Sequence, residues 1–292
     1  MITTTIISMV QTRGMATEKQ LKIRIQGTKN IAKITKSMKM VSAAKLRGDQ
    51  QRLAAAVPFS AWAGAITGAP VPLEEFDASK LPQKNLIVAF TTDKGLCGGV
   101  NSIMGRMTKQ LLTKIDKDGK SYELFVMGEK GKSSFRRFAG DKLVGTATER
   151  VIPYTFDLAS SIAEDAIKGE FDAIHLIYNN FKSAISYIPS IKSITPLTDP
   201  TSEILYPFDV EPENDEEGLK SFFEYTLATQ IFHSLLDNAT SEQSSRMNAM
   251  ENASKNAGEM IDKLTLQYNR ARQARITTEL IEIISGASAL KN

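Results

Sequence analysis

The last eighty residues carry a hydrophobic pattern that repeats every seven positions. No proline occurs between Glu213 and Asn292, and residues of high helix propensity fill most of this stretch. Apolar and small side chains alternate at three- and four-residue spacing, at Met247, Met250, Ser254, Ala257, Ile261, Leu264, Tyr268 and Ala271. This heptad seam predicts a coiled coil, in a helix that would be roughly 110 Å long at ~1.5 Å per residue. No compact domain of this size needs such a helix, so we interpret it as a shaft or a spacer.

The N-terminal region offers a partner for this helix. No proline precedes Pro58, and the same spacing recurs at Ile31, Ile34, Met38 and Val41. We therefore predict that an N-terminal helix over 18–57 pairs with the C-terminal helix over 213–292 as a long antiparallel coiled coil. An ordinary helix bundle is the alternative, but the chain lacks a third and a fourth amphipathic helix of matching length.

Between these ends the pattern changes to short apolar runs that alternate with amphipathic stretches. Prolines and glycines over 58–84 indicate a linker, which a short extension of the first helix could precede. Within 85–212 we expect strands at 86–90, 122–127, 171–178 and 185–194, and helices at 100–117, 129–138 and 158–168. Pro189 favours an edge position for the last strand. The alternation predicts a doubly wound, Rossmann-like central α/β domain.

The net charge of +3 conceals a strong asymmetry. Residues 1–57 hold eleven Lys or Arg and only two acids, a balance of +9 that leaves −6 for the rest of the chain. Residues 199–217 hold eight Asp or Glu and no base. A basic helix suits nucleic acid, a membrane surface or an acidic protein partner, or is merely a solvated face. No aromatic residue lies between Glu18 and Val57, which disfavours nucleic acid.

Side chains for catalysis or metal binding are scarce. Cys97 is the only cysteine, which excludes an internal disulfide, and His175 and His233 lie in unrelated segments without metal-ligand spacing. We find no Ser/His/Asp or Cys/His arrangement. The longest apolar runs are far shorter than the ~18 residues of a membrane-spanning helix.

The turn at 92–99, with sequence TDKGLCGG, is the one glycine-rich segment that could suggest a nucleotide site. It lacks the Lys-Ser or Lys-Thr of a phosphate-binding loop and the spacing of a dinucleotide fingerprint. We interpret its glycines as allowing a tight strand-to-helix turn. We accordingly expect no catalytic, cofactor-binding or metal-binding residue in this chain.

Residues 1–17 resemble a targeting segment in composition. They contain five Thr, one Ser and one Arg but no acid. We read them as a possible mitochondrial transit peptide, and a frayed N-terminal tail is the alternative.

Four segments, in this order, resemble one known family. Residues 33–41 (KITKSMKMV), 93–99 (DKGLCGG), 240–247 (TSEQSSRM) and 276–287 (ITTELIEIISGA) are similar to motifs of the gamma subunit of F-type ATP synthases, in its mitochondrial form. Arg is frequent in that family at the position of Lys94. The resemblance spans about 18–290 without a large insertion.

The resemblance implies a rotor shaft rather than an enzyme. The coiled coil would turn inside a ring of three alpha and three beta subunits, and the α/β domain would form a foot on the membrane c-ring with the delta and epsilon subunits. Proton flow would rotate the ring, foot and shaft, and the asymmetric shaft would drive the catalytic sites of beta through their states during ATP synthesis. The resemblance implies a place on the matrix side of the mitochondrial inner membrane, peripheral through the c-ring, with no transmembrane segment, cofactor or nucleic acid.

The resemblance also assigns partner contacts to individual residues. Positions matching those that hydrogen-bond a loop of beta are Arg272, Gln273 and Thr277. The basic face of the first helix suits an acidic lever on beta, in the zone of Lys33, Lys36 and Met38. The tip that turns in the bearing carries Leu280, Ile283, Ile284, Ala287 and Leu290. Tyr206, in the acidic stretch, is a candidate for contact between the foot and the c-ring.

Two other classes of protein remain open on the residues alone. One is a nucleotide-dependent enzyme built on the α/β domain, which nucleotide binding by the isolated chain would support. The other is a coiled-coil tether or nucleic-acid protein that uses the basic helix, for which strongly salt-dependent binding to DNA would be evidence.

Overall fold

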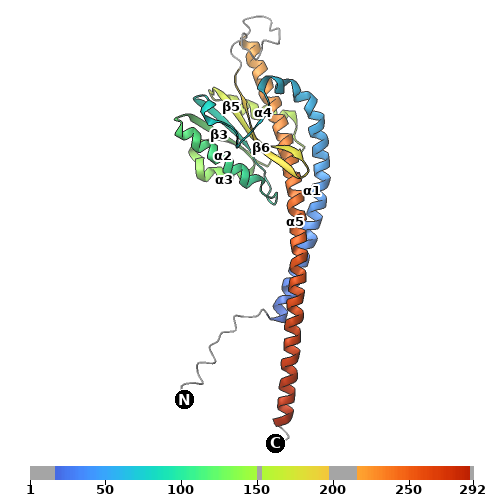
Figure 1. Cartoon of the computed structure of the whole chain (residues 1–292). Coiled ribbons are helices and arrows are strands. Elements are labelled where there is room, and N and C mark those ends of the chain that lie inside the picture. Colours follow the sequence, from blue (N-terminus) through green and yellow to red (C-terminus); the bar gives the residue numbers. More distant parts are fainter. Residues whose placement is uncertain (1–16, 150–152, 197–215, 290–292) are drawn as a thin grey trace, which may run out of the picture. The chain divides into compact units, whose positions relative to one another are not determined.

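The computed structural model describes residues 17–149, 153–196 and 216–289. They fall into two compact units, one drawn from positions 1–39 and 250–292 and the other from positions 40–249. Two long helices, α1 (Glu18–Thr67) and α5 (Glu216–Ala289), contribute to both (Figure 1). We call the first the paired-helix unit and the second the α/β unit.

In the paired-helix unit, α1 and α5 run antiparallel. Arg275 Nε donates to Glu18 Oε2 at 2.7 Å, and Lys39 Nζ donates to Glu251 Oε1 at 2.7 Å. Residue numbers therefore rise along α1 as they fall along α5. This confirms the predicted antiparallel pairing of the two ends of the chain.

The heptad seam predicted on α5 is the face of that helix that is shielded from solvent in this unit. Every predicted position from Met250 to Ala271 is buried or half-buried, whereas most positions between them are exposed. Met250 and Ala257 are the most enclosed, at 5% and 6% exposure. The three-and-four spacing thus identified the contact face of α5 correctly.

The seam predicted on α1 is wrong at three of its four positions. Ile31, Ile34 and Val41 are 55%, 58% and 54% exposed. The covered positions in this unit are instead Leu21, Ile25, Thr28, Ala32 and Thr35, together with the fourth predicted position, Met38, which is half-buried. The threonines tolerate burial because their hydroxyls donate to carbonyls one turn back, Thr28 to Arg24 at 2.9 Å and Thr35 to Ile31 at 3.0 Å.

The α/β unit contains a six-stranded sheet in the order β1-β6-β5-β2-β3-β4. Its strands are β1 (Val71–Pro72), β2 (Lys84–Phe90), β3 (Ser121–Met127), β4 (Leu143–Ala147), β5 (Ala173–Ser183) and β6 (Ser186–Ile194). Its shorter helices are α2 (Val100–Lys117), α3 (Glu129–Ala139) and α4 (Phe156–Ile167), with 3-10 turns at Ala78–Lys80 and Gly140–Lys142. Strands β5, β2, β3 and β4 are mutually parallel, and β6 is antiparallel to both of its neighbours.

Helices cover both faces of this sheet (Figure 1). Leu86, Val88 and Phe90 of β2 face a core that α4 and the first third of α5 complete. Ile87 and Ala89, which alternate with them, face a second core that α2 and α3 complete. A strand buried on both faces reads as a continuous apolar run, as β2 does. The predicted doubly wound architecture is confirmed.

The first helix is longer than the periodicity indicated. It continues to Thr67 with Pro58 inside it, so the first part of the expected linker is helical. Aromatic packing accounts for this: the Trp62 ring stacks on Tyr225 of α5, with centroids 5.4 Å apart, and Phe59 meets Phe232 edge to face. The sequence signal of one proline was outweighed by tertiary contacts.

Strand β6 lies second from the edge rather than at it, because the two-residue strand β1 pairs outside it. Pro189 fits there because its carbonyl accepts from Leu73 N–H at 2.9 Å, on the side where β1 offers little pairing. Neither β1 nor β4 was predicted; both are short, and β4 is only partly buried.

Candidate interaction surfaces on the two long helices

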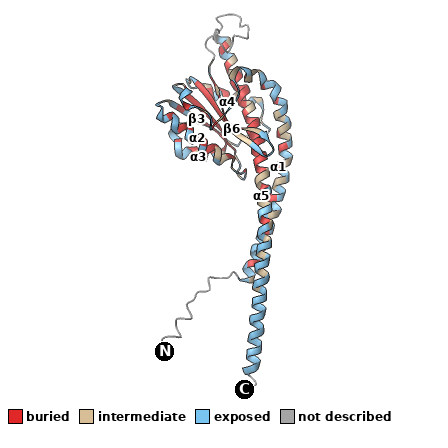
Figure 2. Ribbon diagram, viewed as in Figure 1, coloured by how far each residue is buried: buried red, intermediate tan, exposed pale blue. Residues whose placement is uncertain are grey.

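The C-terminal end of α5 is uncovered within the described part of the chain. Every residue from Arg272 to Ala289 is exposed (Figure 2). Several are large and apolar: Ile276 is 43% exposed, Leu280 53%, Ile281 58%, Ile283 67% and Ile284 63%. A contiguous apolar surface of this kind marks a site for a partner in a soluble protein.

Four of the five predicted tip residues share one face of that segment. Leu280, Ile283, Ile284 and Ala287 follow the i, i+3, i+4, i+7 spacing of a helical stripe, and all are exposed. Leu290 and Tyr206 lie outside the described residues, as does most of the acidic stretch. The stripe therefore presents an apolar ridge rather than a charged one.

The predicted loop-contact residues lie just before this ridge. Arg272, Gln273 and Thr277 are all exposed, and Gln273 and Thr277 stand one turn apart. The Thr277 hydroxyl donates to the Gln273 carbonyl at 3.0 Å. Among the described residues, the side chains of Arg272 and Gln273 make no hydrogen bond or ion pair, so their donors are available to a partner. By contrast, neighbouring Arg275 is held by Glu18 and Glu279, whose charges raise its pKa.

The three residues predicted to face the acidic lever of beta, Lys33, Lys36 and Met38, do not share one face of α1. Lys33 and Lys36 are exposed and lie on one face of α1, since they are three residues apart. Met38 is half-buried and falls on the opposite side, towards the face that α1 turns to α5. The structure thus supports a basic surface at the two lysines but separates Met38 from it.

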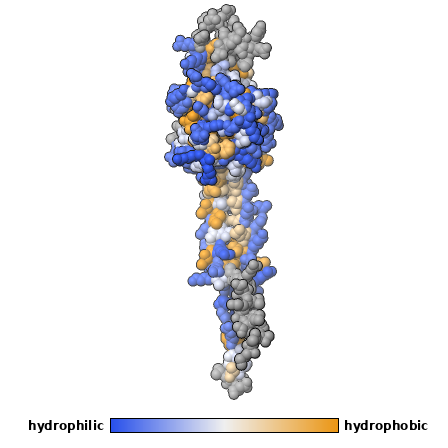
Figure 3. All heavy atoms as spheres, turned by 90° about the vertical axis from the view of Figure 1, so that its left-hand side faces the viewer, coloured by the Kyte–Doolittle hydropathy of each residue, from blue (hydrophilic) through white to orange (hydrophobic). Residues whose placement is uncertain are grey.

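A second exposed apolar surface lies on α1, and it was not predicted from the sequence. Ile23, Ile31 and Ile34 are 64%, 55% and 58% exposed in the paired-helix unit. The space-filling view shows apolar side chains at the surface along the paired helices (Figure 3). Part of the signal was present in the sequence, because Ile31 and Ile34 belong to the spacing that we assigned to the coiled-coil seam.

In the α/β unit, α5 is fixed to the glycine-rich turn by hydrogen bonds that sequence reasoning missed. The Ser245 hydroxyl donates to the Cys97 carbonyl at 2.7 Å, and Arg246 Nη2 donates to the Gly95 carbonyl at 3.4 Å. Arg246 is itself paired with Glu242 at 2.5 Å, with both side chains about nine-tenths buried. Burial raises the pKa of the Glu242 carboxyl despite the favourable charge of Arg246.

The glycines of this turn allow the close approach. Gly98 has φ +61°, and a Cβ there would lie 2.9 Å from the Ser245 hydroxyl oxygen. Two of the four family-like motifs, 93–99 and 240–247, therefore contact each other. A run of Ser, Thr, Asn and Gln on a buried helix, 237–246, was the available sequence signal for such anchoring.

The same segment of α5, residues 237–246, is also bonded to β5 and to the turn after it. The Ser241 hydroxyl donates to the Asn179 carbonyl at 2.9 Å, and Asn179 Nδ2 donates to Asn238 Oδ1 at 2.9 Å. Ser244 donates to the Ala184 carbonyl at 2.6 Å. Helix α5 is thus held at two places in the α/β unit, which fixes its rotation about its own axis there.

The residues that could have carried chemistry are structural in this environment. His175 is bonded to Asn85 and Ser193, and burial lowers its pKa to about 4. Burial raises the pKa of the Cys97 thiol, which makes it a poor nucleophile. Within 17–149, 153–196 and 216–289, no group of acidic, His and Cys side chains could hold a metal ion. No helix in those ranges combines the length and hydropathy required to span a bilayer.

Known proteins resemble this chain along nearly its whole length. The family model described as ATP synthase matches residues 17–290. The mitochondrial ATP synthase subunit gamma of Drosophila melanogaster is 44% identical, over 96% of this chain and 93% of its own length. The ATP synthase gamma chain of Zymomonas mobilis is 41% identical, over 94% of this chain and 100% of its own length.

Solved structures agree with the sequence relatives. A chain in the central stalk and c-ring structure of the Tetrahymena thermophila mitochondrial ATP synthase matches with a TM-score of 0.62 and 33% identity, covering 76% of this chain and 99% of that one. A chain of the Euglena gracilis mitochondrial ATP synthase has a TM-score of 0.74 and covers 94% of both chains, and at 20% identity it bears on the fold alone. On these matches, the chain belongs to the gamma-subunit family of ATP synthases.

Proposed function

We propose that this chain is the central-stalk rotor subunit of an F-type, proton-translocating ATP synthase. It passes rotation of the c-ring to three catalytic beta subunits, within a ring that also holds three alpha subunits, and contributes no catalytic group. The delta and epsilon subunits accompany its α/β unit on the c-ring. The complex is mitochondrial, and this subunit lies on the matrix side of the inner membrane without entering it.

The observation that carries the proposal is the contrast within α5. Its residues 237–246 are buried and bonded at two places in the α/β unit, whereas 272–289 are exposed and carry the apolar ridge. A shaft requires this combination. Its attached part must not turn relative to the α/β unit, and its end must be able to turn against the surrounding subunits. An apolar ridge suits a bearing, since it offers few hydrogen bonds that would stop rotation.

We also propose the individual residue roles that the family resemblance implies. Arg272, Gln273 and Thr277 contact a loop of beta, and Lys33 and Lys36 face an acidic lever of beta. Met38 contributes to the paired helices beside that lever. Leu280, Ile283, Ile284, Ala287 and Leu290 line the bearing, and Tyr206 belongs to the contact with the c-ring. Residues 1–17 act as a transit peptide, which N-terminal sequencing of the mature chain would test.

Co-purification tests the assignment directly. The affinity-tagged chain should recover alpha and beta subunits in about threefold molar excess, because three copies of each surround one shaft. Replacing Ile281, Ile283 and Ile284 by serine should reduce that recovery. The matched control is Val144→Ser, since Val144 is similarly exposed at 55% but lies on β4. Equimolar recovery, or equal losses in the two variants, would refute the proposal.

A further inference from the structure

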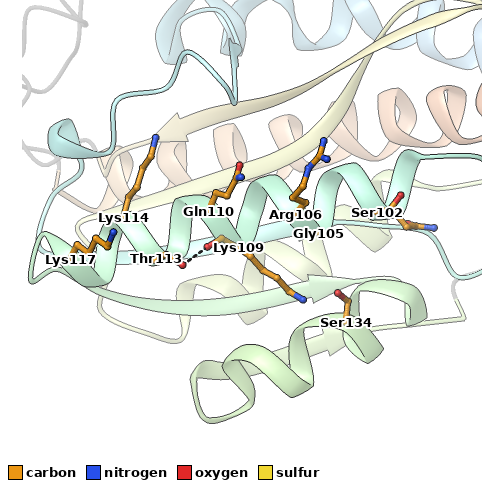
Figure 4. Close-up of a pocket in the computed structure, with 10 residues that line it drawn as sticks. Ser102, Gly105, Arg106, Lys109, Gln110, Thr113, Lys114, Lys117 and Ser134 are labelled. Carbon is orange, nitrogen blue, oxygen red and sulfur yellow. Dashed lines mark hydrogen bonds between the residues drawn. The ribbon is translucent and has the colours of Figure 1, made fainter.

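An open groove of about 860 Å³ lies along α2, and none of the residue roles proposed above involves it. The side chains that line it are polar or charged, and they include four cations of α2, namely Arg106, Lys109, Lys114 and Lys117 (Figure 4). Ser134 contributes from α3. We call this the basic groove.

The cations of the basic groove are not neutralised by the described part of the chain. No ion pair joins any of the four to an acid there. Asp116, the one acid on α2, is paired with Lys142 at 2.6 Å instead. The α3 acid Glu129 is similarly paired with Lys132 at 3.8 Å. The groove therefore holds an uncompensated positive charge, which attracts anions and orients them.

The cations extend from α2 in two directions. Arg106, Gln110 and Lys114 extend the same way from α2, at four-residue spacing, while Lys109 reaches towards α3 (Figure 4). Lys109 Nζ lies 5.5 Å from the centre of the Phe138 ring, which holds it in place. Arg106 and Lys117 are eleven residues apart, so the charged row is roughly 16 Å long at ~1.5 Å per residue.

We propose that the basic groove is a docking site for an acidic protein segment that carries carboxylates at helical spacing. A row of this length and period matches Glu or Asp at every third or fourth position. Serine, threonine and glutamine side chains along the groove supply further donors for carboxylate oxygens. A small free anion would leave most of the row unpaired.

Two other classes of ligand fit less well. A membrane surface would need apolar side chains for insertion, and the groove lining contains none. Single-stranded nucleic acid would need aromatic rings on which bases stack, and none of the residues that line the groove is aromatic. The open, hydrogen-bonding basic groove therefore favours a polypeptide over a membrane surface or a nucleic acid.

The test uses the full chain and a labelled helical peptide of about four turns with glutamate at three- and four-residue spacing. Fluorescence anisotropy compares the parent chain with the triple variant Arg106→Gln, Lys114→Gln, Lys117→Gln. The matched control removes three cations from α3 outside the groove, as Lys130→Gln, Arg136→Gln, Arg137→Gln. We expect affinity to fall at least about tenfold in the groove variant and less than about twofold in the control.

Other outcomes overturn the proposal. Equal losses in the two triple variants would mean that only net charge matters, and unchanged affinity in both would place the peptide elsewhere, for example on α1. The same comparison with phosphatidylserine vesicles and duplex DNA separates ligand classes. Groove-dependent binding of either, without groove-dependent peptide binding, would contradict the assignment to protein. Far-UV circular dichroism of each variant confirms that the fold is retained.

Discussion

Two arginine–glutamate pairs on the same helix show how differently its two ends behave. Arg246 pairs with Glu242 one turn away, and their side chains are 10% and 11% exposed. Arg275 pairs with Glu279, also one turn away, and theirs are 55% and 53% exposed. The residue types and the four-residue spacing are the same, although the order of Glu and Arg along the helix is reversed. The large difference in exposure comes from the surroundings.

The difference shows that one continuous helix can be anchored in one part and exposed in another. A buried pair fixes its neighbours, because moving either partner would leave a charge without water. In an exposed pair, water can solvate both charges when the pair separates, so the pair constrains the positions of its neighbours little. Both pairs lie on one continuous helix, which is what a transmission element requires.

The largest expected effect comes from breaking the buried pair. Arg246→Ala should lower the free energy of unfolding of the α/β unit by about 3 kcal/mol, because it strands the Glu242 carboxylate and two backbone carbonyls. Urea unfolding followed by Trp62 fluorescence measures it, since Trp62 is the sole tryptophan and stacks on Tyr225. Adding Glu242→Gln to Arg246→Ala should recover part of the loss.

The exposed pair provides the control for that experiment. Arg275→Ala should leave urea unfolding unchanged within error. If Arg246→Ala and Arg275→Ala behaved alike, the distinction between anchored and free ends of α5 would fail.

The next effect concerns pH and Asp237 in the anchored segment. Burial raises the pKa of this carboxyl to about 7, and the Phe181 N–H and Lys182 oppose the rise only weakly. Burial also lowers the pKa of His233, which lies 3.7 Å away, so the two are a neutral contact rather than an ion pair. Lys192 of β6 adds to that lowering, and its own pKa is reduced to about 8.

The sign follows from the folded pKa lying above the unfolded value. Below about pH 4 both states hold the proton, and between about 4 and 7 only the unfolded chain releases it, so stability falls as pH rises. Asp237→Asn removes this loss. The variant should match the parent near pH 4 and exceed it by about 2–4 kcal/mol above pH 7. Urea unfolding at intermediate pH values measures the difference, and a difference independent of pH would contradict the burial argument.

A smaller effect is expected at the glycine-rich turn. Gly98→Ala should cost about 1–3 kcal/mol in unfolding free energy, because the residue has positive φ and a Cβ would press on Ser245. Gly27→Ala on α1 is the matched control, since nothing lies within 4 Å of a Cβ there. That variant should gain up to about 1 kcal/mol from helix propensity. Thermal unfolding compares them, and equal signs would refute the packing account.

The sequence predicted the elements of this fold better than their contacts. The α5 seam was found because large side chains such as Ile261 and Leu264 mark it. The α1 seam was missed because Thr28 and Thr35 line it, while isoleucines on another face are stronger signals. A single chain cannot show whether an apolar stripe is reserved for itself or for a partner.

The anchor of α5 was beyond pattern reasoning for a different reason. Ser245 and Cys97 are 148 positions apart, and their hydrogen bond depends on the complete sheet. Local spacing identifies which face of a helix is covered but not what covers it. The family resemblance rests on four separate motifs, and the structure shows that two of them, 93–99 and 240–247, contact each other.

The smallest expected effect on the isolated chain is at the free end of α5. Arg272→Ala with Gln273→Ala should leave thermal unfolding unchanged, because neither side chain makes a hydrogen bond or ion pair among the described residues. In the assembled complex the same change should lower coupled ATP turnover about tenfold, as loss of about 1.4 kcal/mol at a barrier would. Lys263→Ala with Gln267→Ala, exposed about two turns earlier on α5, should lower turnover far less. Turnover that is equal in the two double variants would mean that this end of the helix slides without specific contacts.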